Sequence, residues 1–396
     1  MSELRDVVIV SGVRLPVGSF GGSLKGISAI DMGAMVVKEA VNRAGIKPSD
    51  VDEVIIGEVG EVAQDGFIAR AVSLKAGMPK ETTAYSVNRQ CASSLQSIAD
   101  AVMQIQTGVA DVVVAGGTEN VSQLPYYVKD ARWGARMGHK TFEDGVLDIL
   151  TWPLTNSHNG VTAENVATKY NVSREEQDAF ALQSHQRACK AISEGKFKDE
   201  ILPVELKDRK GNVTVFDTDE GPRASQTIEK LAKLRACFVD GGTVTAGNSS
   251  SLNDGAAAVV VMSADKAKEL GVAPKLKIEG FAVAGFDADL MGYSPKFSSE
   301  KLASKLGLDL TKIDMFEINE AFASQAFAVA RDLNLDMDKV NIYGGGISIG
   351  HPLGATGAIL TVKVLYELLR TDKKDAMISM CIGGGQGMSM YFTKCE

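Results

Sequence analysis

Strand-like apolar runs alternate with helical patterns along most of the chain, which is typical of α/β architecture. In the first part, residues 30–44 predict a helix and residues 51–59 a strand. Residues 83–87 predict a buried strand, and residues 111–115 predict another that ends at a glycine pair. The helix between them carries one apolar stripe at spacings of three and four residues, formed by Leu95, Ile98, Val102 and Ile105.

The last third of the chain repeats this order. Residues 313–318, 340–343 and 376–381 predict strands, and the last of these ends at three glycines. The helix before it has the same 3-4-3 spacing of apolar residues, at Ile359, Val362, Tyr366 and Leu369. We infer two similar halves, although many α/β chains share such an alternation. The parallel places Cys91 and His351 at equivalent strand-to-helix turns, which face each other if the halves pack about a pseudo-twofold axis.

The stretch between the halves is richer in polar turns and lacks this rhythm, apart from a helical pattern at residues 173–194. An insertion of this length usually covers a site or builds an interface. We therefore expect three units. Residues 1–118 and 250–272 form an N-terminal half, residues 119–249 form an inserted loop domain, and residues 273–396 form a C-terminal half.

Composition narrows the classes of function. The chain has 396 residues, 45% of them hydrophobic and 23% charged, as in soluble globular proteins. Its net charge of −8 disfavours nucleic acid or an anionic membrane as the main partner. No apolar run reaches membrane-spanning length, and the first residues lack the features of a signal or transit peptide. We expect a cytoplasmic protein.

The number and spacing of the cysteines indicate that the protein is found in a reducing compartment. Five are present and none is spaced as a C-x-x-C pair, which argues against a disulfide framework or a structural zinc site. Motifs for a catalytic metal, for nucleotide phosphates and for a serine nucleophile (HExxH, GxGxxG, GxxxxGK[ST] and GxSxG) are missing from the sequence. The sequence therefore gives no support for nucleotide binding of those kinds or for a serine hydrolase, and we expect no metal site.

Cys91 is the first candidate for chemistry. It follows a predicted strand and begins a predicted helix, where free N–H groups and a partial positive charge favour a thiolate. A lowered thiol pKa is what a nucleophilic cysteine needs. The alternative is an ordinary buried cysteine, the commoner fate of this residue type.

His351 and Cys381 are also held next to glycines. His351 lies between a glycine-rich turn and Pro352, so it is rigidly placed and suits a general base for a thiol. The alternative is a capping or surface histidine. Cys381 ends a strand before three glycines that include Gly383, and successive N–H groups in such a turn can form an oxyanion hole. A second thiol here is either a proton carrier or a disulfide partner, and the pattern alone does not choose.

Two further polar residues are ambiguous. Asn319 follows a predicted strand and precedes a helix, so it is either a helix N-cap or a ligand for a water or a substrate oxygen. His158, in a segment rich in asparagine, reads equally well as a loop histidine.

Taken together, four segments resemble the thiolases, enzymes that make and break 3-ketoacyl thioesters of coenzyme A. The four are Asn88–Ser94, Asn319–Phe322, Gly350–Gly357 and Cys381–Gly385, and matching stretches at 116–120, 162–165, 243–250 and 253–257 extend the resemblance over essentially the whole chain. The short-chain, biosynthetic type is the most similar; it condenses two acetyl-CoA molecules to acetoacetyl-CoA and CoA. The resemblance implies a five-layer α-β-α-β-α fold of two similar halves plus an inserted loop domain.

The resemblance also implies roles for residues. Cys91 would carry the acyl group, His351 would activate it, and Cys381 would move the proton on the α-carbon of the substrate. One oxyanion hole would be His351 with a water held by Asn319, and the other would be the N–H groups of Cys91 and Gly383.

The resemblance further implies how substrate and partner chains are bound. His158 and Ser250 match positions that line the coenzyme A tunnel, and Arg223 matches an arginine near the nucleotide end. The substrates would be acyl-CoA and CoA, with no prosthetic group. The segment 132–138 resembles part of a tetramer contact, so we expect a homotetramer built as a dimer of dimers.

Several departures from the family pattern lie near the expected acyl pocket. Ser94 replaces a usual glycine, Asn159 stands where short-chain members often have methionine, and Trp152 is a large aromatic in the same region. Segments 249–251 and 291–295 also differ from the usual sequences. These departures leave acyl-chain length and branching open.

We therefore expect a short-chain thiolase, and keep three other functions as alternatives. They are a broader 3-ketoacyl-CoA thiolase accepting longer or branched chains, a ketoacyl-carrier-protein synthase of the same fold, and a non-catalytic CoA- or lipid-binding homologue.

Overall fold

The computed structural model describes residues 4–395 and contains one hydrogen-bonded sheet of ten strands. Residues 1–3, on which part of the expectation about a leader peptide rests, lie outside the described residues. The strands of the first half are β1 (Val7–Arg14), β2 (Gly18–Ser19), β3 (Glu53–Gly57), β4 (Thr83–Val87), β5 (Val112–Asn120) and β12 (Asn253–Ser263). Those of the second half are β13 (Leu276–Gly285), β14 (Phe316–Ile318), β15 (Asp375–Ile382) and β16 (Gln386–Lys394).

Seven α-helices accompany these strands within residues 4–395. They are α1 (Ala29–Ala44), α2 (Ile68–Lys75), α3 (Ser93–Thr107), α8 (Ala264–Leu270), α9 (Ser294–Leu306), α10 (Ala323–Asp332) and α11 (Thr356–Arg370). Their ends follow local chemistry. For example, the Ser28 hydroxyl accepts the Asp31 N–H at the start of α1, and Gly45 closes the helix at a φ of 70°.

The two halves share one topology, as the sequence repeat predicts. The first half has the order β4-β3-β5-β12-β1, in which the β4–β3 and β3–β5 pairs are parallel and the rest antiparallel. In the second half, a parallel bridge from Val340 to Phe316 is followed by β14-β15-β16-β13, with the same sequence of parallel and antiparallel pairs. Strands β1 and β13 join the halves into one sheet.

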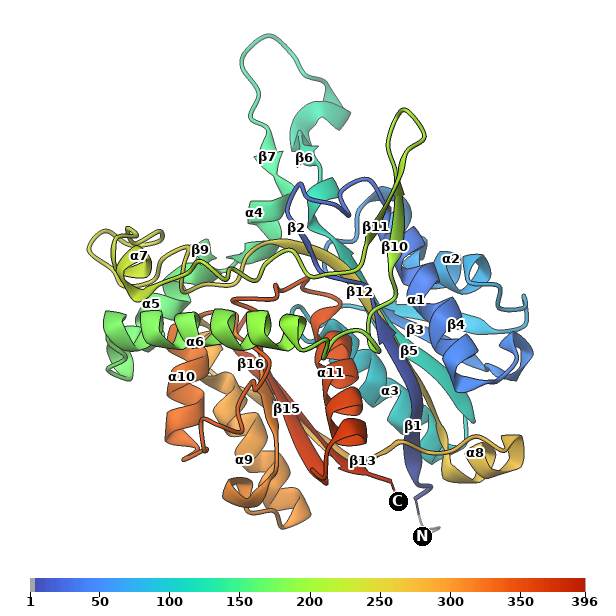
Figure 1. Cartoon of the computed structure of the whole chain (residues 1–396). Coiled ribbons are helices and arrows are strands. Elements are labelled where there is room, and N and C mark those ends of the chain that lie inside the picture. The colour runs from blue at the N-terminus through green and yellow to red at the C-terminus, as the bar shows by residue number, and fades with distance from the viewer. Residues whose placement is uncertain (1–3, 396) are drawn as a thin grey trace.

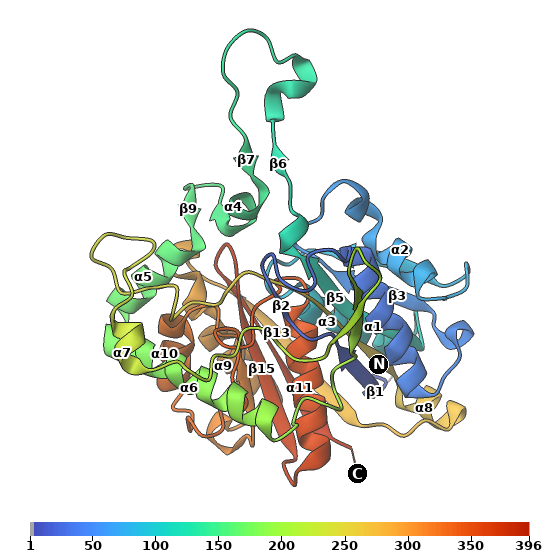
Figure 2. The same cartoon turned by 45° about the horizontal axis from the view of Figure 1, so that its top comes forward.

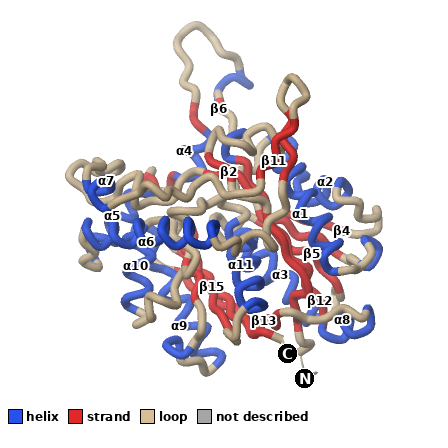
Figure 3. The backbone as a smooth tube through the Cα atoms, in the orientation of Figure 1, coloured by secondary structure: helices blue, strands red, loops and turns tan. Residues whose placement is uncertain are grey.

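The helices and the two sets of strands are stacked in five layers (Figures 1 and 3). Successive side chains along each strand point to opposite faces, so each strand contributes to two cores. Val112 and Val114 of β5 face α1 and α2 in one core, whereas Val113 and Ala115 face a central core. That central core is formed by α3 and α11 between the two sets of strands, and Ile378 of β15 belongs to it. The opposite face of the second-half strands packs against α9 and α10. The five-layer α/β fold expected from the sequence is thereby confirmed.

Four details of the sequence-based prediction are wrong. Strand β4 is not buried, because it lies at the edge of the sheet and Tyr85 is exposed. Residues 340–343 form a single bridge at Val340 and not a strand. Strand β5 continues past the glycine pair to Asn120. Leu369, the last member of the α11 stripe, is exposed.

The inserted segment between β5 and β12 has its own short elements. Its strands are β6 (Tyr126–Tyr127), β7 (Glu143–Asp144), β8 (Thr151–Trp152), β9 (Ser157–His158), β10 (Val204–Lys207) and β11 (Val213–Phe216). Its helices are α4 (Gly145–Leu150), α5 (Asn159–Lys169), α6 (Arg174–Ser193) and α7 (Ile228–Ala232). The expected helix at 173–194 is α6, which begins with a capping box of Ser173 and Glu176. Figures 1 and 2 show the β6–β7 hairpin projecting as an arm away from the body.

A buried ion pair network ties the insertion to the body. Arg14 of β1 is fully buried, and its guanidinium binds Glu200 at 2.8 Å and Asp219 at 2.7 Å. The two carboxylates raise the pKa of Arg14 against the effect of burial, so the guanidinium stays charged. Because removing one partner would leave a buried charge unpaired, this network fixes the path of residues 200–219.

Candidate active site

Cys91 lies in the tight turn that leads from β4 into α3. Gln90, the residue before it, has a φ of 47°, a left-handed conformation that costs a non-glycine residue about 1–3 kcal/mol. Helix α3 begins two residues later at Ser93, with Ala92 as its N-cap. The turn sits tightly against β3, because a Cβ on Gly57 would lie 2.5 Å from the backbone of Ser93 and Ser94. A strained and closely packed turn of this kind holds the Cys91 thiol in a fixed position.

The Cys91 thiol is not the low-pKa group that its helix position predicts. Burial raises the pKa of Cys91 to about 11, because only 4% of the residue is exposed and the thiolate is poorly solvated. The backbone N–H groups of Gly383 and of Cys91 itself point at the sulfur and act in the opposite direction. The expectation of a lowered pKa is therefore wrong, since desolvation outweighs the helix N-terminus.

His351 is buried in the turn before α11, so the alternatives of a surface or capping histidine are wrong. Its N–H donates to Asn253 Oδ1 at 2.9 Å, and its ring Nδ1 lies 2.7 Å from the Thr356 hydroxyl. That hydroxyl is also 2.8 Å from the Pro352 carbonyl, to which it donates, so it accepts a hydrogen from Nδ1. Nε2 is then the basic nitrogen. Burial lowers the pKa of His351 to about 4, which keeps the ring neutral and able to accept a proton.

Asn319 completes this arrangement from β14. Its Nδ2 lies 3.3 Å from His351 Nε2, and its N–H donates to the Ser379 carbonyl at 2.9 Å. The N-cap alternative is wrong, because α10 begins at Ala323 with Phe322 as its cap. The Oδ1 atom of Asn319 is buried and has no hydrogen-bond partner within the described residues. A buried acceptor without a partner is a place where a water or a substrate group can bind.

Cys381 and Gly383 come from the end of β15. Cys381 is fully buried and its Sγ lies 3.9 Å from Gln325 Oε1. Burial raises the pKa of Cys381, and the nearby Cys91 sulfur raises it further. The turn from Gly383 to Gly385 needs glycine, since Gly384 and Gly385 have φ values of 84° and 83°.

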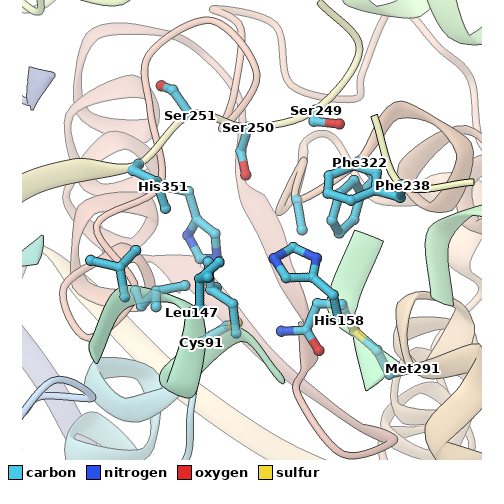
Figure 4. Close-up of a pocket in the computed structure, with 16 residues that line it drawn as sticks. Cys91, Leu147, His158, Phe238, Ser249, Ser250, Ser251, Met291, Phe322 and His351 are labelled. Carbon is cyan, nitrogen blue, oxygen red and sulfur yellow. The ribbon is translucent and has the colours of Figure 1, made fainter. Parts of the chain in front are cut away.

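Cys91 and His351 both line a cleft that, together with the open solvent at its mouth, contains about 850 Å³ of space free of protein atoms. Figure 4 shows the rings of His351 and His158 and the Cys91 side chain around this cleft. Apolar side chains form most of its wall, and the other lining residues are Val146, Leu147, Leu150, Asn159, Phe238, Ser249, Ser250, Ser251, Leu252, Met291, Ala321, Phe322 and Leu353. An apolar cleft with a few polar groups is typical of a site for an organic ligand.

His158 and Ser250, predicted to contact coenzyme A, both line this cleft. His158 is the N-cap of α5, where its Nδ1 accepts the Gly160 N–H at 3.0 Å. Its ring stacks on Phe238 at a centroid distance of 5.0 Å. A Cβ on Gly160 would lie 2.3 Å from the Phe238 ring, so the glycine makes room for this stack.

Arg223 is not among the residues that line the cleft. It is exposed, and its N–H donates to His185 Nδ1 at 3.3 Å. The segment that carries it crosses the His351 turn closely, since a Cβ on Gly221 would lie 2.3 Å from the Ser348 carbonyl oxygen. The segment that carries Arg223 thus passes close to the turn before His351, but the Arg223 side chain does not line the cleft.

Sequence reasoning missed the residues that hold the site. Thr356 and Asn253 orient His351, Gln325 contacts Cys381, and Phe238 lines the cleft. Thr356 lies in the same glycine-rich segment as His351, and Asn253 lies in the stretch 253–257 that extends the resemblance, so both positions carried a signal. Gln325 and Phe238 come from distant segments and carry no motif by which a contact with the site could be recognised.

Within residues 4–395, no group of three or more His, Cys, Asp or Glu side chains is arranged to hold a metal ion. No helix of the same part of the chain is both long and apolar enough to span a membrane.

Comparisons with known proteins agree on one family. The model for the thiolase N-terminal domain matches residues 7–265, and the model for the thiolase C-terminal domain matches residues 272–394. The acetyl-CoA acetyltransferase of Syntrophomonas wolfei is 46% identical over 393 residues, covering 98% of each chain.

Two solved structures are also similar over nearly their full length. The crystal structure of the Bacillus anthracis acetyl-CoA acetyltransferase has a TM-score of 0.97 and 44% identity, and covers 100% of both chains. That of human mitochondrial 3-ketoacyl-CoA thiolase in complex with CoA has a TM-score of 0.95 and 41% identity, with 99% of this chain and 98% of that chain covered.

Proposed function

Because this chain belongs to the thiolase family and is an acyltransferase, we propose that it makes and breaks short 3-ketoacyl thioesters of coenzyme A through an acyl group carried on Cys91. In the synthetic direction two acetyl-CoA molecules give acetoacetyl-CoA and CoA. In the reverse direction, thiolysis, a 3-ketoacyl-CoA and CoA give acetyl-CoA and a shortened acyl-CoA. CoA thioesters as substrates are supported by the relatives named acetyl-CoA acetyltransferase and by the related thiolase solved with CoA.

One observation carries the assignment of Cys91. The N–H groups of Cys91 and Gly383 converge on the Cys91 sulfur, in the same cleft that His351 lines. Two backbone donors beside a nucleophile can stabilise the oxyanion that forms when the sulfur attacks a carbonyl. One such donor typically contributes about 2.7–4 kcal/mol to the transition state.

In thiolysis, the Cys91 sulfur attacks the 3-keto carbon while its proton passes to His351 Nε2. The bond between C2 and C3 then breaks, and its electron pair goes to C2 of the departing acetyl-CoA. The Cys381 thiol protonates that carbon, and the proton on His351 passes on to restore the Cys381 thiol. The products of this half-reaction are acetyl-CoA and an acyl group on Cys91.

In the second half-reaction, the thiol of CoA attacks the acyl group on Cys91. Its proton goes to His351 and then to the Cys91 sulfur, which leaves with its bonding pair. The products are acyl-CoA and the free Cys91 thiol, so atoms and protons balance. Condensation runs through the same steps in reverse.

The neighbours of His351 and Cys381 support these roles. A neutral ring with Nδ1 bonded to Thr356 presents Nε2 as the base. The free Oδ1 of Asn319 is suited to accept a hydrogen from a water. The other hydrogen of that water, together with the N–H that His351 Nε2 carries after it takes the proton of Cys91, would bind the thioester oxygen of the enolate. The raised pKa of Cys381 makes its thiol the resting form, which is the form that donates a proton in thiolysis. The proposed chemistry needs no prosthetic group or metal.

We also propose a homotetramer and a cytoplasmic location. The tetramer is supported by two surfaces, the open edge of β4 and the projecting arm, where Trp133, Met137 and Phe142 are exposed. An open strand edge pairs readily with another chain, and exposed aromatic and apolar clusters favour interfaces.

The proposed cytoplasmic location is supported by the five cysteines, all of which are free thiols. His158, Ser250 and Arg223 keep their proposed roles in binding CoA.

Thiolysis of acetoacetyl-CoA by free CoA tests this function. The wild-type protein should cleave the substrate, and Cys91→Ser should lose the activity by several orders of magnitude while keeping its fold by circular dichroism. Retention of activity in Cys91→Ser would refute the role of this residue. A folded wild-type protein without activity would favour a carrier-protein-dependent enzyme or a binding protein instead.

A further inference from the structure

A buried carboxylate accepts hydrogen bonds from two segments that approach the active site, and the proposed mechanism does not use it. Glu119 belongs to β5, and only 1% of the residue is exposed. Its Oε2 accepts the Gly354 N–H at 2.7 Å and the Val59 N–H at 3.1 Å, and its Oε1 accepts the Gly60 N–H at 2.9 Å. Backbone donors of this kind favour the ionised form of a carboxyl group.

One of these bonds anchors the turn that carries His351. Gly354 follows in the same turn, and its contact with Glu119 is close, since a Cβ on Gly354 would lie 2.9 Å from Glu119 Oε2. The His351 N–H is bound by Asn253 of β12 at 2.9 Å. Pro352, between the two donors, has no N–H of its own. Side chains of the first half, Asn253 and Glu119, therefore hold this turn of the second half at both ends.

The other bonds lead to the turn that carries Cys91. Val59 donates its N–H to Glu119, and the Val59 carbonyl accepts a hydrogen from Asn88 Nδ2 at 3.3 Å. The Oδ1 of the same asparagine accepts the N–H of Gln90, the residue before Cys91, at 3.0 Å. A chain of hydrogen bonds thus runs from the Cys91 turn through Val59 and the Glu119 carboxylate to the facing turn of the second half.

The groups that face Glu119 decide its charge. Burial raises the pKa of Glu119 to about 7, the backbone N–H donors oppose this effect, and Asp254 of β12 adds to it. Glu58, the residue after β3, is neutral at pH 7 because burial and the charge of Glu119 raise its pKa to about 10. Cys91 and His351, on the other two elements, are also neutral at rest. Glu119 is therefore ionised above about pH 7 and protonated below it.

We propose that Glu119 is a positioning residue whose ionised carboxylate holds the His351 turn in place against the Cys91 turn. This inference rests on the proposed function, because it concerns the passage of the Cys91 proton to His351. A protonated carboxyl group carries a hydrogen on one oxygen and accepts fewer hydrogen bonds, so its hold on the N–H groups of Gly354 and Val59 weakens. Proton transfer needs the two atoms within hydrogen-bond reach, so a small displacement of either turn lowers kcat.

The pH dependence of thiolysis by the wild type and by Glu119→Gln tests this role. The amide mimics the protonated carboxyl group, because it is uncharged and keeps one acceptor oxygen. At about pH 8.5 the variant should have about one-tenth of the wild-type kcat or less, with little change in the KM for CoA. The ratio of wild-type to variant kcat should fall toward one at about pH 5.5, because Glu119 of the wild type is then protonated. The ratio cancels the titration of CoA and of His351, which both proteins share.

Two further variants separate charge from position. Glu61→Gln is the matched control, because it removes a negative charge from an exposed residue of the segment after β3. It should leave kcat and its pH dependence unchanged. Glu119→Asp keeps the charge on a side chain too short to reach all the donors. Its kcat should fall at about pH 8.5, and the further loss of kcat below about pH 7 should remain.

Circular dichroism at each pH checks that the proteins stay folded. A ratio of wild-type to Glu119→Gln kcat that is the same at both pH values would overturn the inference and indicate a packing role only. If Glu119→Gln does not fold, the other two proteins still decide. A wild-type kcat that does not change with pH over this range, or full kcat in Glu119→Asp, would overturn it. A folded wild-type protein without thiolysis activity at any pH would instead refute the proposed function.

Discussion

At the scale of single residues, burial decides the chemistry of the site. Cys91 and His351 are both nearly inaccessible, and burial favours the neutral form of each. The resting pair is therefore a thiol and a neutral imidazole, not a thiolate and an imidazolium. In the proposed mechanism, the nucleophile is therefore activated during attack, when the proton moves to His351 as the oxyanion donors take up the developing charge.

Alkylation of Cys91 should report this resting state. With the pKa of Cys91 raised to about 11, the reactive thiolate fraction grows about tenfold for each pH unit below that value. The rate of modification by iodoacetamide should thus rise about 100-fold between pH 7 and pH 9. Peptide mapping separates Cys91 from the exposed Cys237. A rate that levels off below pH 8 would show that the thiolate is stabilised in the resting enzyme.

Thr356 is a positioning residue whose effect should appear in turnover. Thr356→Val keeps the shape of the side chain but leaves the His351 Nδ1–H unpaired, which costs about 1–3 kcal/mol and frees the ring to change tautomer. We expect kcat to fall about tenfold or more, with little change in the KM for CoA. Thr356→Ser, which restores the hydroxyl, should recover most of kcat. Equal losses in kcat and stability for Val and Ser would indicate a packing role only.

At the scale of elements, glycines let α3 and α11 approach each other and their strands. A Cβ on Gly357 would lie 2.4 Å from the Leu95 nitrogen, and one on Gly117 would lie 2.1 Å from the Gly354 carbonyl oxygen. The Ser94 hydroxyl accepts the Ala358 N–H at 2.9 Å across the same contact. Because Cys91 and His351 lie just before these two helices, the close contact sets how far apart the two side chains are.

Gly357→Ala tests this contact. The added methyl meets backbone, which cannot move aside as a side chain can, so we expect a loss of about 1–3 kcal/mol in the free energy of unfolding. Chemical denaturation measures it, together with a fall in activity from the displaced turn. Gly26→Ala is the matched control, since a Cβ there meets nothing within 4 Å. Equal stabilities for the two variants would contradict the argument.

At the scale of the whole molecule, the site is assembled from both halves and the insertion. Cys91 comes from the first half, whereas Asn319, His351 and Cys381 come from the second. The insertion adds His158 and Phe238, which wall the cleft. Since neither half holds all of these residues, we expect the proposed reaction to depend on the docking of the halves and on the buried Arg14 ion pairs that hold the insertion.

The proposed tetramer makes a prediction at this scale. Light scattering of the wild-type protein should give the mass of four chains. A double variant, Trp133→Asp with Met137→Asp, places charges on the exposed arm and should reduce the assembly to two chains. Val109→Asp, at an exposed residue between α3 and β5, should leave the mass unchanged. A wild-type protein that is monomeric would refute the assembly.

Much of the fold was predictable from the sequence, because the spacing of apolar residues within each half predicts the order of its helices and strands. The helix at 30–44, the apolar stripe of α3 and the strand before Cys381 depend on neighbours within a few residues, and all are confirmed. The edge position of β4 and the single bridge formed by residues 340–343 depend on which strands lie next to them in the sheet. Local sequence does not contain that information.

For the site, the sequence by itself determined which residue types are present and at which turns they lie. Cys91, His351, Asn319 and Cys381 were candidates because glycine, proline and strand ends mark unusual backbone geometry next to reactive side chains, and the resemblance to the thiolases implied their roles. Only the tertiary structure decided their electrostatic states and surroundings. The pKa of Cys91 is raised rather than lowered because desolvation arises from the packing of both halves, and not from the helix that follows it. The packing of Trp152 from the insertion on the glycine turn at Gly384 is likewise a tertiary contact that the sequence does not record.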